Sequence, residues 1–412
     1  MTLSEELKWR GLLEQTTYKD ITDIDHDPIS FYIGVDPSTD SITIGNLAVL
    51  ILAKHFIQAG HKAYILIGGA TGSIGDPDGK TEERQLLSLK TIEENKKAII
   101  QQYRQIFEDL PYTIVDNYDW FKDIKFLDFL RNVGKHVPMR QMVNREFVQT
   151  RLNGNGISFA EFSYSLIQGY DFLTLFTEKG VSLQIAGSDQ WGNALAGVDL
   201  IRRITGKSAN VWTMPLIIDK SSGKKFGKTE AGAVWLNPKK TSPTSFYQFW
   251  INTSDESVID FLKIYTSFTK EDILEIENKH NAKPKNRLAQ KALAINVTKL
   301  VHGQKLANLA ESVTGYLIGD QDISLASDEE LSTIRSEIKS YKIEQDMDLE
   351  MILVACSLAK SKSEARKLIS NQGIYVNNQK YTDSNLNRQL FKNGRLLIRR
   401  GKAFKDSALL EI

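Results

Sequence analysis

The sequence predicts an α/β protein, with a parallel sheet covered by helices on both faces, then an α-helical domain and a small α+β domain. Short apolar runs alternate with helical patterns over residues 31–218, which is typical of parallel sheets. Strand patterns then disappear between Thr241 and about Ile318, while helical patterns continue. From Leu349 onward the chain has 12 Lys and Arg against 5 Asp and Glu, although its net charge is only +1.

The predicted strands of the sheet are four short apolar runs, at 31–35, 63–68, 182–187 and 211–218. Helical periodicity marks 47–59, 91–108 and 190–206, and a further helical pattern covers 162–172. Ligands of such sheets bind where the strands end at their carboxyl edge. The loops after these strands are therefore the first candidates for a site.

We expect four parts along the chain: 1–240, 241–318, 319–348 and 349–412. The segment 319–348 is rich in Asp, Glu and Ser, and is predicted to be a linker with one short helix at 328–341. The last part is predicted to hold a helix at 361–370 and strands at 373–378 and 395–402. An insertion at about 120–151 interrupts the sheet domain.

Composition narrows the class of protein. A chain of 412 residues that is 41% hydrophobic can bury more than one core. One cysteine, Cys356, excludes an intrachain disulfide, and the six scattered histidines give no metal spacing, so no protein-bound metal is expected. Because no apolar run is long enough to span a membrane and the N-terminus does not resemble a signal peptide, we expect no membrane association and a cytoplasmic location.

Charge is distributed unevenly, at +7 after Leu349 and −6 before it. A basic domain on an acidic body indicates an anionic partner, such as RNA or an anionic lipid. A solvated basic surface is the alternative.

A strand, a polar loop and a helix start follow one another around Gly45. Backbone N–H groups and the helix dipole converge at such a place and form an anion site, and glycine lets the backbone approach a phosphate closely. A second candidate is the polar loop that holds Lys225 and Lys228 on either side of Gly227. Two ammonium groups can stabilise a pyrophosphate leaving group, although such a lysine pair alone can be a solvated turn.

Three further segments contribute polar side chains. The glycine-dense segment 68–80 is either a plain β–α turn or a ligand-binding loop, and 185–193 is a polar loop after a strand. Tyr164, Gln168 and Asp171 fall at i, i+4 and i+7, so they share one helix face. Such a stripe is either a binding face or a solvent face.

The motifs Thr43-Ile-Gly-Asn46 and Lys225-Phe-Gly-Lys-Thr229 together resemble the paired nucleotide signatures of class I aminoacyl-tRNA synthetases. The residues between them narrow the resemblance to bacterial-type tyrosyl-tRNA synthetases. The resemblance implies a Rossmann-like catalytic domain (1–240) with a dimer-forming insertion, and an S4-like RNA-binding domain (349–412). It also implies that the chain joins tyrosine to Mg²⁺-bound ATP as tyrosyl-adenylate, and then transfers the tyrosyl group to the 3′ end of tRNA(Tyr).

The resemblance also implies a role for individual residues. Asp171 and Tyr32 would bind the phenolic hydroxyl of tyrosine, and Asp76, Tyr164 and Gln168 its ammonium group. The full set implied for tyrosine is Tyr32, Asp76, Tyr164, Gln168, Asp171 and Gln190. The set implied for ATP is Asp36, Ser38, Gly45, Lys80, Arg84, Gly187 and Asp189, and the catalytic set is Thr43, Asn46, Lys225 and Lys228.

Thr43 departs from the family pattern, which has histidine at this position. A non-catalytic RNA-binding relative with a decayed ATP site is therefore an alternative. A synthetase for another aromatic amino acid is a further alternative, against which Tyr32 together with Asp171 favours a hydroxylated ring. The insertion has apolar residues that would form either a dimer interface or a core, namely Phe126, Leu127, Phe129 and Leu130.

Overall fold

The computed structural model describes residues 1–77, 86–154, 156–221, 223, 225–229, 232–343, 348–401 and 403–412. The chain forms two units: residues 1–241 with 253–293, and residues 242–252 with 294–412. The predicted helical domain at 241–318 is therefore divided between the two units.

A six-stranded sheet is the centre of the first unit, in the order β1-β6-β5-β2-β3-β4. All neighbours are parallel except β1, which runs antiparallel to β6. The chain leaves β2 for β3 on one side and later returns to β5 on the other, so the strand order reverses between β2 and β5. The strands are β1 (Gln15–Thr16), β2 (Ser30–Val35), β3 (Lys62–Ile67), β4 (Tyr112–Asp116), β5 (Leu183–Gly187) and β6 (Asn210–Met214).

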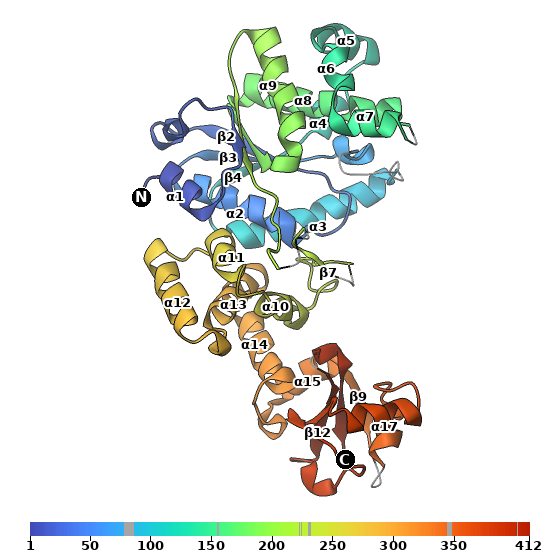
Figure 1. The fold of residues 1–412 in the computed structure, drawn as a ribbon. Coiled ribbons are helices and arrows are strands. Elements are labelled where there is room, and N and C mark those ends of the chain that lie inside the picture. The colour runs from blue at the N-terminus through green and yellow to red at the C-terminus, as the bar shows by residue number, and fades with distance from the viewer. Residues whose placement is uncertain are drawn as a thin grey trace. The chain divides into compact units, whose positions relative to one another are not determined.

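Helices cover both faces of this sheet, as predicted (Figure 1). Alternate residues of β2 face opposite layers: Phe31 packs on Phe56 of α2, with ring centroids 5.4 Å apart, and Tyr32 on Phe172 of α8, at 5.2 Å. One layer contains α2 (Ile44–Gln58) and α3 (Leu89–Phe107), and the other α8 (Phe159–Lys179) and α9 (Trp191–Thr205).

Two glycines let α8 and α9 pack closely. A Cβ at Gly197 would lie 2.9 Å from Phe172 Cβ, and one at Gly169 would lie 3.3 Å from the Gly197 nitrogen. The side chain of Ser158 accepts from the Glu161 N–H at the start of α8, and Gly180, in the left-handed region at φ 69°, ends that helix. The helix that holds Tyr164 and Asp171 is thus fixed at both ends and along its length.

The insertion between β4 and α8 is helical, with α4 (Tyr118–Phe121), α5 (Phe126–Asn132), α6 (Met139–Val143) and α7 (Glu146–Leu152). Phe129 packs inward on Tyr170, with ring centroids 5.7 Å apart. Phe126, Leu127 and Leu130 are exposed. A buried ion pair between Arg151 and Glu161, at 2.9 Å, fixes the end of the insertion to α8.

Part of the predicted helical domain packs on the sheet domain. Arg10 of α1 (Leu3–Arg10) donates to the carbonyl oxygens of Lys263, Thr266 and Phe268, at 2.7, 3.1 and 2.7 Å, and so satisfies groups at the end of α11. The Tyr265 hydroxyl donates to the carbonyl of Ile44 at 3.2 Å. These bonds explain why α11 (Val258–Tyr265) and α12 (Lys270–Ala282) belong to the first unit, whereas α13 (Leu288–His302) continues into the second.

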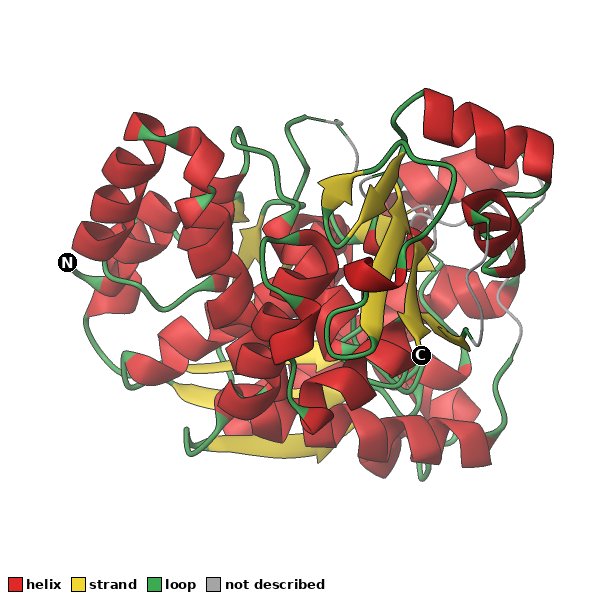
Figure 2. Cartoon of the chain, turned by 90° about the horizontal axis from the view of Figure 1, so that it is seen from below, coloured by secondary structure: helices red, strands yellow, loops and turns green. Residues whose placement is uncertain are grey.

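The second unit contains helices and a five-stranded sheet, ordered β11-β10-β12-β13-β9 (Figure 2). The segment 319–348, expected to be a linker, supplies β9, which pairs in parallel with β13, and its helix ends at Glu337 rather than at residue 341. Leu331 and Ile334 of α15 pack with Leu397 and Leu409 of the sheet, so this segment has a core partner. The helices are α10 (Pro243–Ile251), α14 (Gln304–Ile318), α15 (Asp328–Glu337), α16 (Leu349–Ala355) and α17 (Lys362–Ser370). The strands are β9 (Lys339–Lys342), β10 (Ile374–Val376), β11 (Gln379–Lys380), β12 (Arg395–Arg400) and β13 (Ser407–Glu411).

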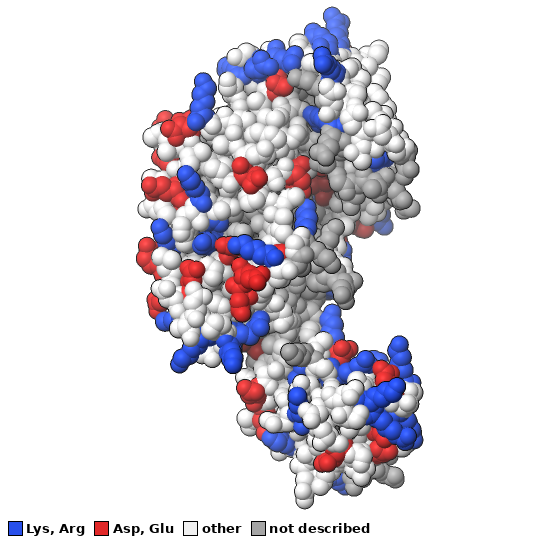
Figure 3. Space-filling view, in the orientation of Figure 1, with Lys and Arg blue, Asp and Glu red and all other residues white. Residues whose placement is uncertain are grey.

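Basic side chains gather over the C-terminal part of the second unit, in the region of α17 (Figure 3). Lys362, Arg366 and Lys367 of that helix are all exposed. Among the described helices, none combines the length and the apolar character needed to cross a bilayer.

Candidate active site

A cavity of about 520 Å³ opens at the carboxyl ends of the strands, beside the reversal between β2 and β5. Its lining includes these predicted site residues: Tyr32, Asp36, Ser38, Thr43, Gly45, Asn46, Asp76, Tyr164, Gln168, Asp171, Gly187, Asp189, Gln190 and Lys225. Lys80 and Arg84 lie outside the described residues. Lys228 is described only in its backbone, as the first residue of β7 (Lys228–Thr229), which pairs with β8 (Gly232–Ala233).

One end of the cavity is formed around the carboxylate of Asp171, which is only 1% exposed. Its two oxygens accept from Trp120 Nε1, at 2.9 Å, and from Asn117 Nδ2, at 3.1 Å. Burial raises the pKa of Asp171 from 3.8 to about 8, although these two hydrogen bonds oppose that shift. The carboxyl group of Asp171 thus accepts a hydrogen bond from the protein on each oxygen, and a lone pair remains for a further donor.

Tyr32 provides a second polar group at this end. Its hydroxyl is buried and has no hydrogen-bond partner among the described residues. Burial, together with the nearby charge of Asp171, raises the pKa of Tyr32 well above its usual value, so the hydroxyl stays protonated. A buried polar atom without a partner is rare in native proteins, and here it lines a cavity, where a ligand could supply the partner.

Asp36, which the resemblance assigns to ATP, lies next to Tyr164, which the resemblance assigns to tyrosine. Its carboxylate accepts from the Tyr164 hydroxyl at 2.7 Å and from Thr71 Oγ1 at 2.6 Å. Asn117 Nδ2 also donates to Thr71 Oγ1 at 3.0 Å. A hydrogen-bond network therefore joins Asp36, Thr71, Asn117 and Asp171 along one wall of the cavity.

Asp76 belongs to a different network. Its carboxylate accepts from Gln190 Nε2 at 2.7 Å, and Gln190 Oε1 in turn accepts from Asn193 Nδ2 at 3.2 Å. Gln168 and Gln184 each leave a buried amide oxygen without a partner among the described residues, and both line the cavity. Carboxylates and amide oxygens are the acceptors that a substrate ammonium group needs.

The first signature lies at the start of α2. The backbone N–H and the hydroxyl of Thr43 both donate to Asn46 Oδ1, at 3.1 and 2.9 Å. Because a backbone N–H can only donate, the amide oxygen of Asn46 faces Thr43, and its Nδ2 points away as a donor. Thr43 therefore orients Asn46 at the helix N-terminus, where an anion is favoured.

The second signature packs directly on the first. Gly227 has φ 95°, and a Cβ there would lie 2.8 Å from Ile44 Cγ1 and 3.8 Å from the Gly45 nitrogen. Val234 joins the two signatures through the backbone. Its N–H donates to the Gly227 carbonyl at 3.0 Å, and its carbonyl accepts from Ile44 N at 3.2 Å. The ring of Phe226 packs on Phe261, with centroids 4.1 Å apart.

Lys225 reaches across to the loop after β5, where its Nζ lies 3.4 Å from Asp189 Oδ2. Both side chains are about half exposed, so the pair is weak in energy. This contact nevertheless brings Lys225 of the second signature to Asp189, the carboxylate that is expected to bind the ribose.

The sequence alone did not single out Thr71, Asn117, Trp120 or Asn193. Thr71 lies within the glycine-dense segment, and Asn193 closes the polar loop after β5, so both lay in segments already of interest. Asn117 follows β4, a strand that was not predicted, and its position at a strand end would have been the signal to find it.

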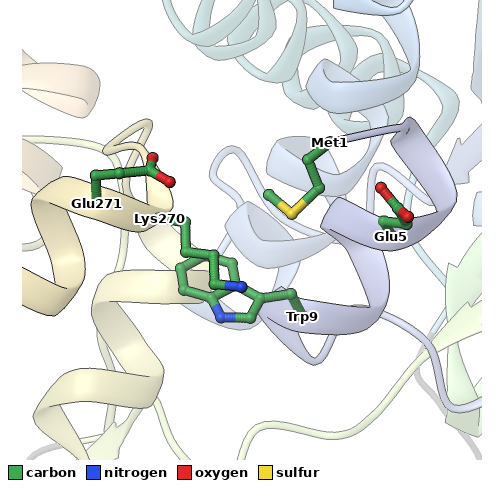
Figure 4. A pocket seen from close by; sticks show the side chains of 5 residues that line it. All are labelled: Met1, Glu5, Trp9, Lys270 and Glu271. Carbon is green, nitrogen blue, oxygen red and sulfur yellow. The ribbon is translucent and has the colours of Figure 1, made fainter.

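A second hollow of about 540 Å³ lies beside the N-terminal helix and is lined by Met1, Glu5, Trp9, Lys270 and Glu271 (Figure 4). The ammonium groups of Lys263 and Lys270 lie 5.4 and 5.9 Å from the Trp9 ring centroid. These cation–π contacts support the packing of α1 near α12. None of the predicted site residues lines this hollow.

Comparison with known proteins agrees with the fold and the cavity. The fold and the cavity are those of a class I aminoacyl-tRNA synthetase. The family model described as "tRNA synthetases class I (W and Y)" matches residues 24–317. The model described as "Tyrosine--tRNA ligase SYY-like C-terminal domain" matches residues 330–405.

Full-length relatives identify the branch of this class. A tyrosine–tRNA ligase of Streptococcus mutans is 42% identical over 413 residues, and one of Bacteroides fragilis 40% over 422 residues, each covering 98% of both chains. A truncated mitochondrial tyrosyl-tRNA synthetase of Aspergillus nidulans superimposes with a TM-score of 0.68 at 27% identity, covering 76% of this chain and 92% of that one. The chain belongs to the tyrosyl-tRNA synthetase family, whose members are ATP-dependent aminoacyl-tRNA synthetases.

Proposed function

We propose that this chain activates L-tyrosine with ATP to tyrosyl-adenylate and transfers the tyrosyl group to the 3′ end of tRNA(Tyr), and that the cavity has a tyrosine half and an ATP half. In the first step the tyrosine carboxylate attacks the α-phosphate and pyrophosphate leaves. In the second, a terminal ribose hydroxyl of the tRNA takes the tyrosyl group and AMP leaves. No side-chain nucleophile is required, because positioning and electrostatics supply the rate.

The tyrosine half has a separate set of residues for each polar end of the substrate. The phenolic hydroxyl donates to Asp171 and accepts from Tyr32, whose hydroxyl has no partner within the described part of the chain. Asp76, Tyr164 and Gln168 surround the ammonium group, and Gln190 contacts the tyrosyl group. Asp36, assigned to ATP from the resemblance, also supports Tyr164 through the 2.7 Å bond to its hydroxyl.

The ATP half is formed by the two signatures and the loop after β5. Gly45 and the N-terminus of α2 face the phosphates, with Ser38 as a hydroxyl donor and with Asn46, which Thr43 orients, as an amide donor. Gly187 and Asp189 receive the ribose, because a carboxylate readily accepts ribose hydroxyls. Lys225 and Lys228 stabilise the pyrophosphate as its charge grows, and Lys80 and Arg84 are assigned to the phosphates from the resemblance alone.

ATP enters as its Mg²⁺ complex, so the ion is part of that substrate. Mg²⁺ is usually held by substrate phosphates with one or two carboxylates and several waters.

The single observation that supports tyrosine as substrate is the buried Asp171 carboxyl near the Tyr32 hydroxyl, which has no hydrogen-bond partner among the residues that the structure describes. We expect tyrosine-dependent exchange of pyrophosphate into ATP by the purified protein. Folded protein that shows no exchange would exclude catalysis and favour the non-catalytic RNA-binding alternative. The similarity over the whole chain to tyrosine–tRNA ligases does not favour that alternative.

Substrate specificity can be tested with Asp171→Ala. Phenylalanine has no hydroxyl to pair with Asp171 and Tyr32, and in this enzyme family such a site is known to reject it by about 10⁵-fold, a magnitude that is not inferred from this cavity. We expect Asp171→Ala to remove most of the preference for tyrosine in kcat/KM for exchange. An unchanged preference would mean that the hydroxyl is recognised elsewhere.

The remaining proposals concern partners and location. Exposed apolar side chains of the insertion support a homodimer, since such a patch is costly to leave in water. The exposed basic residues around α17 support tRNA binding by the C-terminal part. We also propose that the protein works in the cytoplasm, with ATP, tyrosine and tRNA as its substrates.

A further inference from the structure

We propose that Arg145, in the insertion, is a positioning residue for the tyrosine half of the cavity. It sets the direction of a hydrogen-bond relay that ends at Asp76. The inference rests on the proposed roles of Asp76 and Gln190 in holding tyrosine, and it adds a residue that neither the sequence nor the family resemblance singled out.

The relay has three bonds and crosses three segments of the chain. Arg145 Nη1, just before α7, donates to Asn193 Oδ1 at 3.1 Å. Asn193 Nδ2, in the first turn of α9, donates to Gln190 Oε1 at 3.2 Å. Gln190 Nε2 donates to Asp76 Oδ2 at 2.7 Å.

The chemistry of the two ends fixes the direction of the relay. A guanidinium group can only donate, and an ionised carboxylate can only accept. Each amide between them has one oxygen and one NH₂ group. Because Arg145 can only donate, Asn193 must turn its oxygen toward Arg145 and its NH₂ group toward Gln190. Gln190 must then present its oxygen to Asn193 and its NH₂ group to the cavity.

Burial makes this direction matter. Asn193 is 4% exposed, so water cannot readily substitute for a lost partner. If the amide of Gln190 were reversed, its oxygen would face the carboxylate of Asp76. That contact is repulsive and would disturb the carboxylate proposed to hold the ammonium group, whereas the observed NH₂ group attracts it.

The charge at position 145 therefore tests the relay. Arg145→Lys keeps an obligatory donor, whereas Arg145→Glu places an obligatory acceptor at the same end and favours the reversed amides. In tyrosine-dependent exchange we expect Arg145→Glu to raise KM for tyrosine by about 10-fold, with KM for ATP changed by less than about 2-fold. Arg145→Lys should stay within about 3-fold of the unmodified protein.

Two further variants separate the relay from charge or folding effects. Arg202→Glu reverses an exposed charge on α9 that pairs only at the surface, with Asp199, and should leave KM for tyrosine unchanged. Asn193→Asp accepts from Arg145 but cannot donate to Gln190, so it should raise KM for tyrosine as Arg145→Glu does. It also replaces that variant if thermal unfolding shows that Arg145→Glu does not fold.

A Gln190→Ala background distinguishes failure of the relay from failure of the proposed function. There Arg145→Glu should raise KM for tyrosine no further, because the group that the relay orients is gone. An equal rise in both backgrounds, or equal KM values for Arg145→Glu and Arg145→Lys, would overturn the relay. If Gln190→Ala alone leaves KM for tyrosine unchanged, the role proposed for Gln190 is itself wrong.

Discussion

At the scale of single residues, Asp171 is held by hydrogen bonds on both oxygens of its carboxyl group. It is a buried carboxyl that accepts from Asn117 and Trp120, and it lies near the Tyr32 hydroxyl, which has no hydrogen-bond partner among the described residues. Burial raises its pKa to about 8. Burying the Asp171 carboxyl for substrate selection therefore lowers the free energy of unfolding by an amount that depends on pH.

The sign of that dependence follows from the two pKa values. The folded protein holds the Asp171 proton up to about pH 8, whereas the unfolded chain loses it near the ordinary value of 3.8, so stability falls as pH rises between these values. Asp171→Asn removes this titration. We expect its stability relative to the unmodified protein to improve from pH 5 to pH 8, by at most about 1.4 kcal/mol per pH unit.

Urea unfolding at several pH values measures this difference, with Asp189→Asn as the control. Asp189 is about half exposed, so its replacement removes a carboxylate that folding does not bury. A constant difference for Asp171→Asn would show that its carboxyl is not held protonated in the folded protein.

Thr43 is the residue that departs from the family pattern. In place of an imidazole it provides a hydroxyl that orients Asn46. We expect Thr43→His to raise kcat for pyrophosphate exchange, by up to about 10²-fold if a full donor at the phosphates is recovered. Its backbone N–H bond to Asn46 can remain. A fall in kcat would mean that the local site has been rebuilt around the threonine hydroxyl.

At the scale of elements, the loop of the second signature is held against the helix start of the first. Residues 234–236 pair with residues 42–44, and Gly227 packs on Ile44. Phe226 also packs on α11 through Phe261. A change in this loop should therefore act on the ATP step and leave the tyrosine half unaffected.

Gly227→Ala tests this arrangement, with Gly223→Ala as a matched control. Both glycines have positive φ, 95° and 64°, but only a Cβ at Gly227 would meet another atom, Ile44 Cγ1 at 2.8 Å. We expect Gly227→Ala to lower kcat for exchange by about 10²-fold through displacement of the loop, with KM for tyrosine unchanged. Gly223→Ala should stay within about 3-fold. Equal effects of the two variants would assign the loss to backbone strain alone.

At the scale of the whole molecule, the exposed apolar residues of the insertion need a partner surface. Phe126 is 63% exposed and Leu127 75%, and Phe159, at the start of α8, is 68% exposed. Phe129, by contrast, packs inward on Tyr170. The four apolar residues of the insertion thus divide between a core role and a surface role.

We expect Leu127→Asp to convert a dimer to a monomer in analytical ultracentrifugation, because a buried, unpaired carboxylate at an interface is costly. Leu325→Asp is the control: it replaces a leucine that is 77% exposed in the second unit and should leave the mass unchanged. A monomeric unmodified protein, or a dimer that survives Leu127→Asp, would contradict an interface centred on this surface.

The sequence by itself determined the fold class, the strands at 31–35 and 63–68, and the helices at 47–59 and 190–206, because apolar periodicity and glycine positions are local properties. It also determined the family, because Thr43-Ile-Gly-Asn46, Lys225-Phe-Gly-Lys-Thr229 and the polar face of α8 are local motifs. Residues such as Tyr164, Gln168 and Asp171 could be grouped in advance, since one helix places them on one face.

Only the tertiary structure decided which distant residues support these groups. Asn117 and Trp120 reach Asp171 from β4 and the insertion, and Arg145 reaches Gln190 through Asn193. It also decided that α11 packs with the sheet and that β9 joins the C-terminal sheet, where a linker was expected. These contacts join segments far apart in the chain, and no periodicity within a segment encodes which partner the folded protein brings to it.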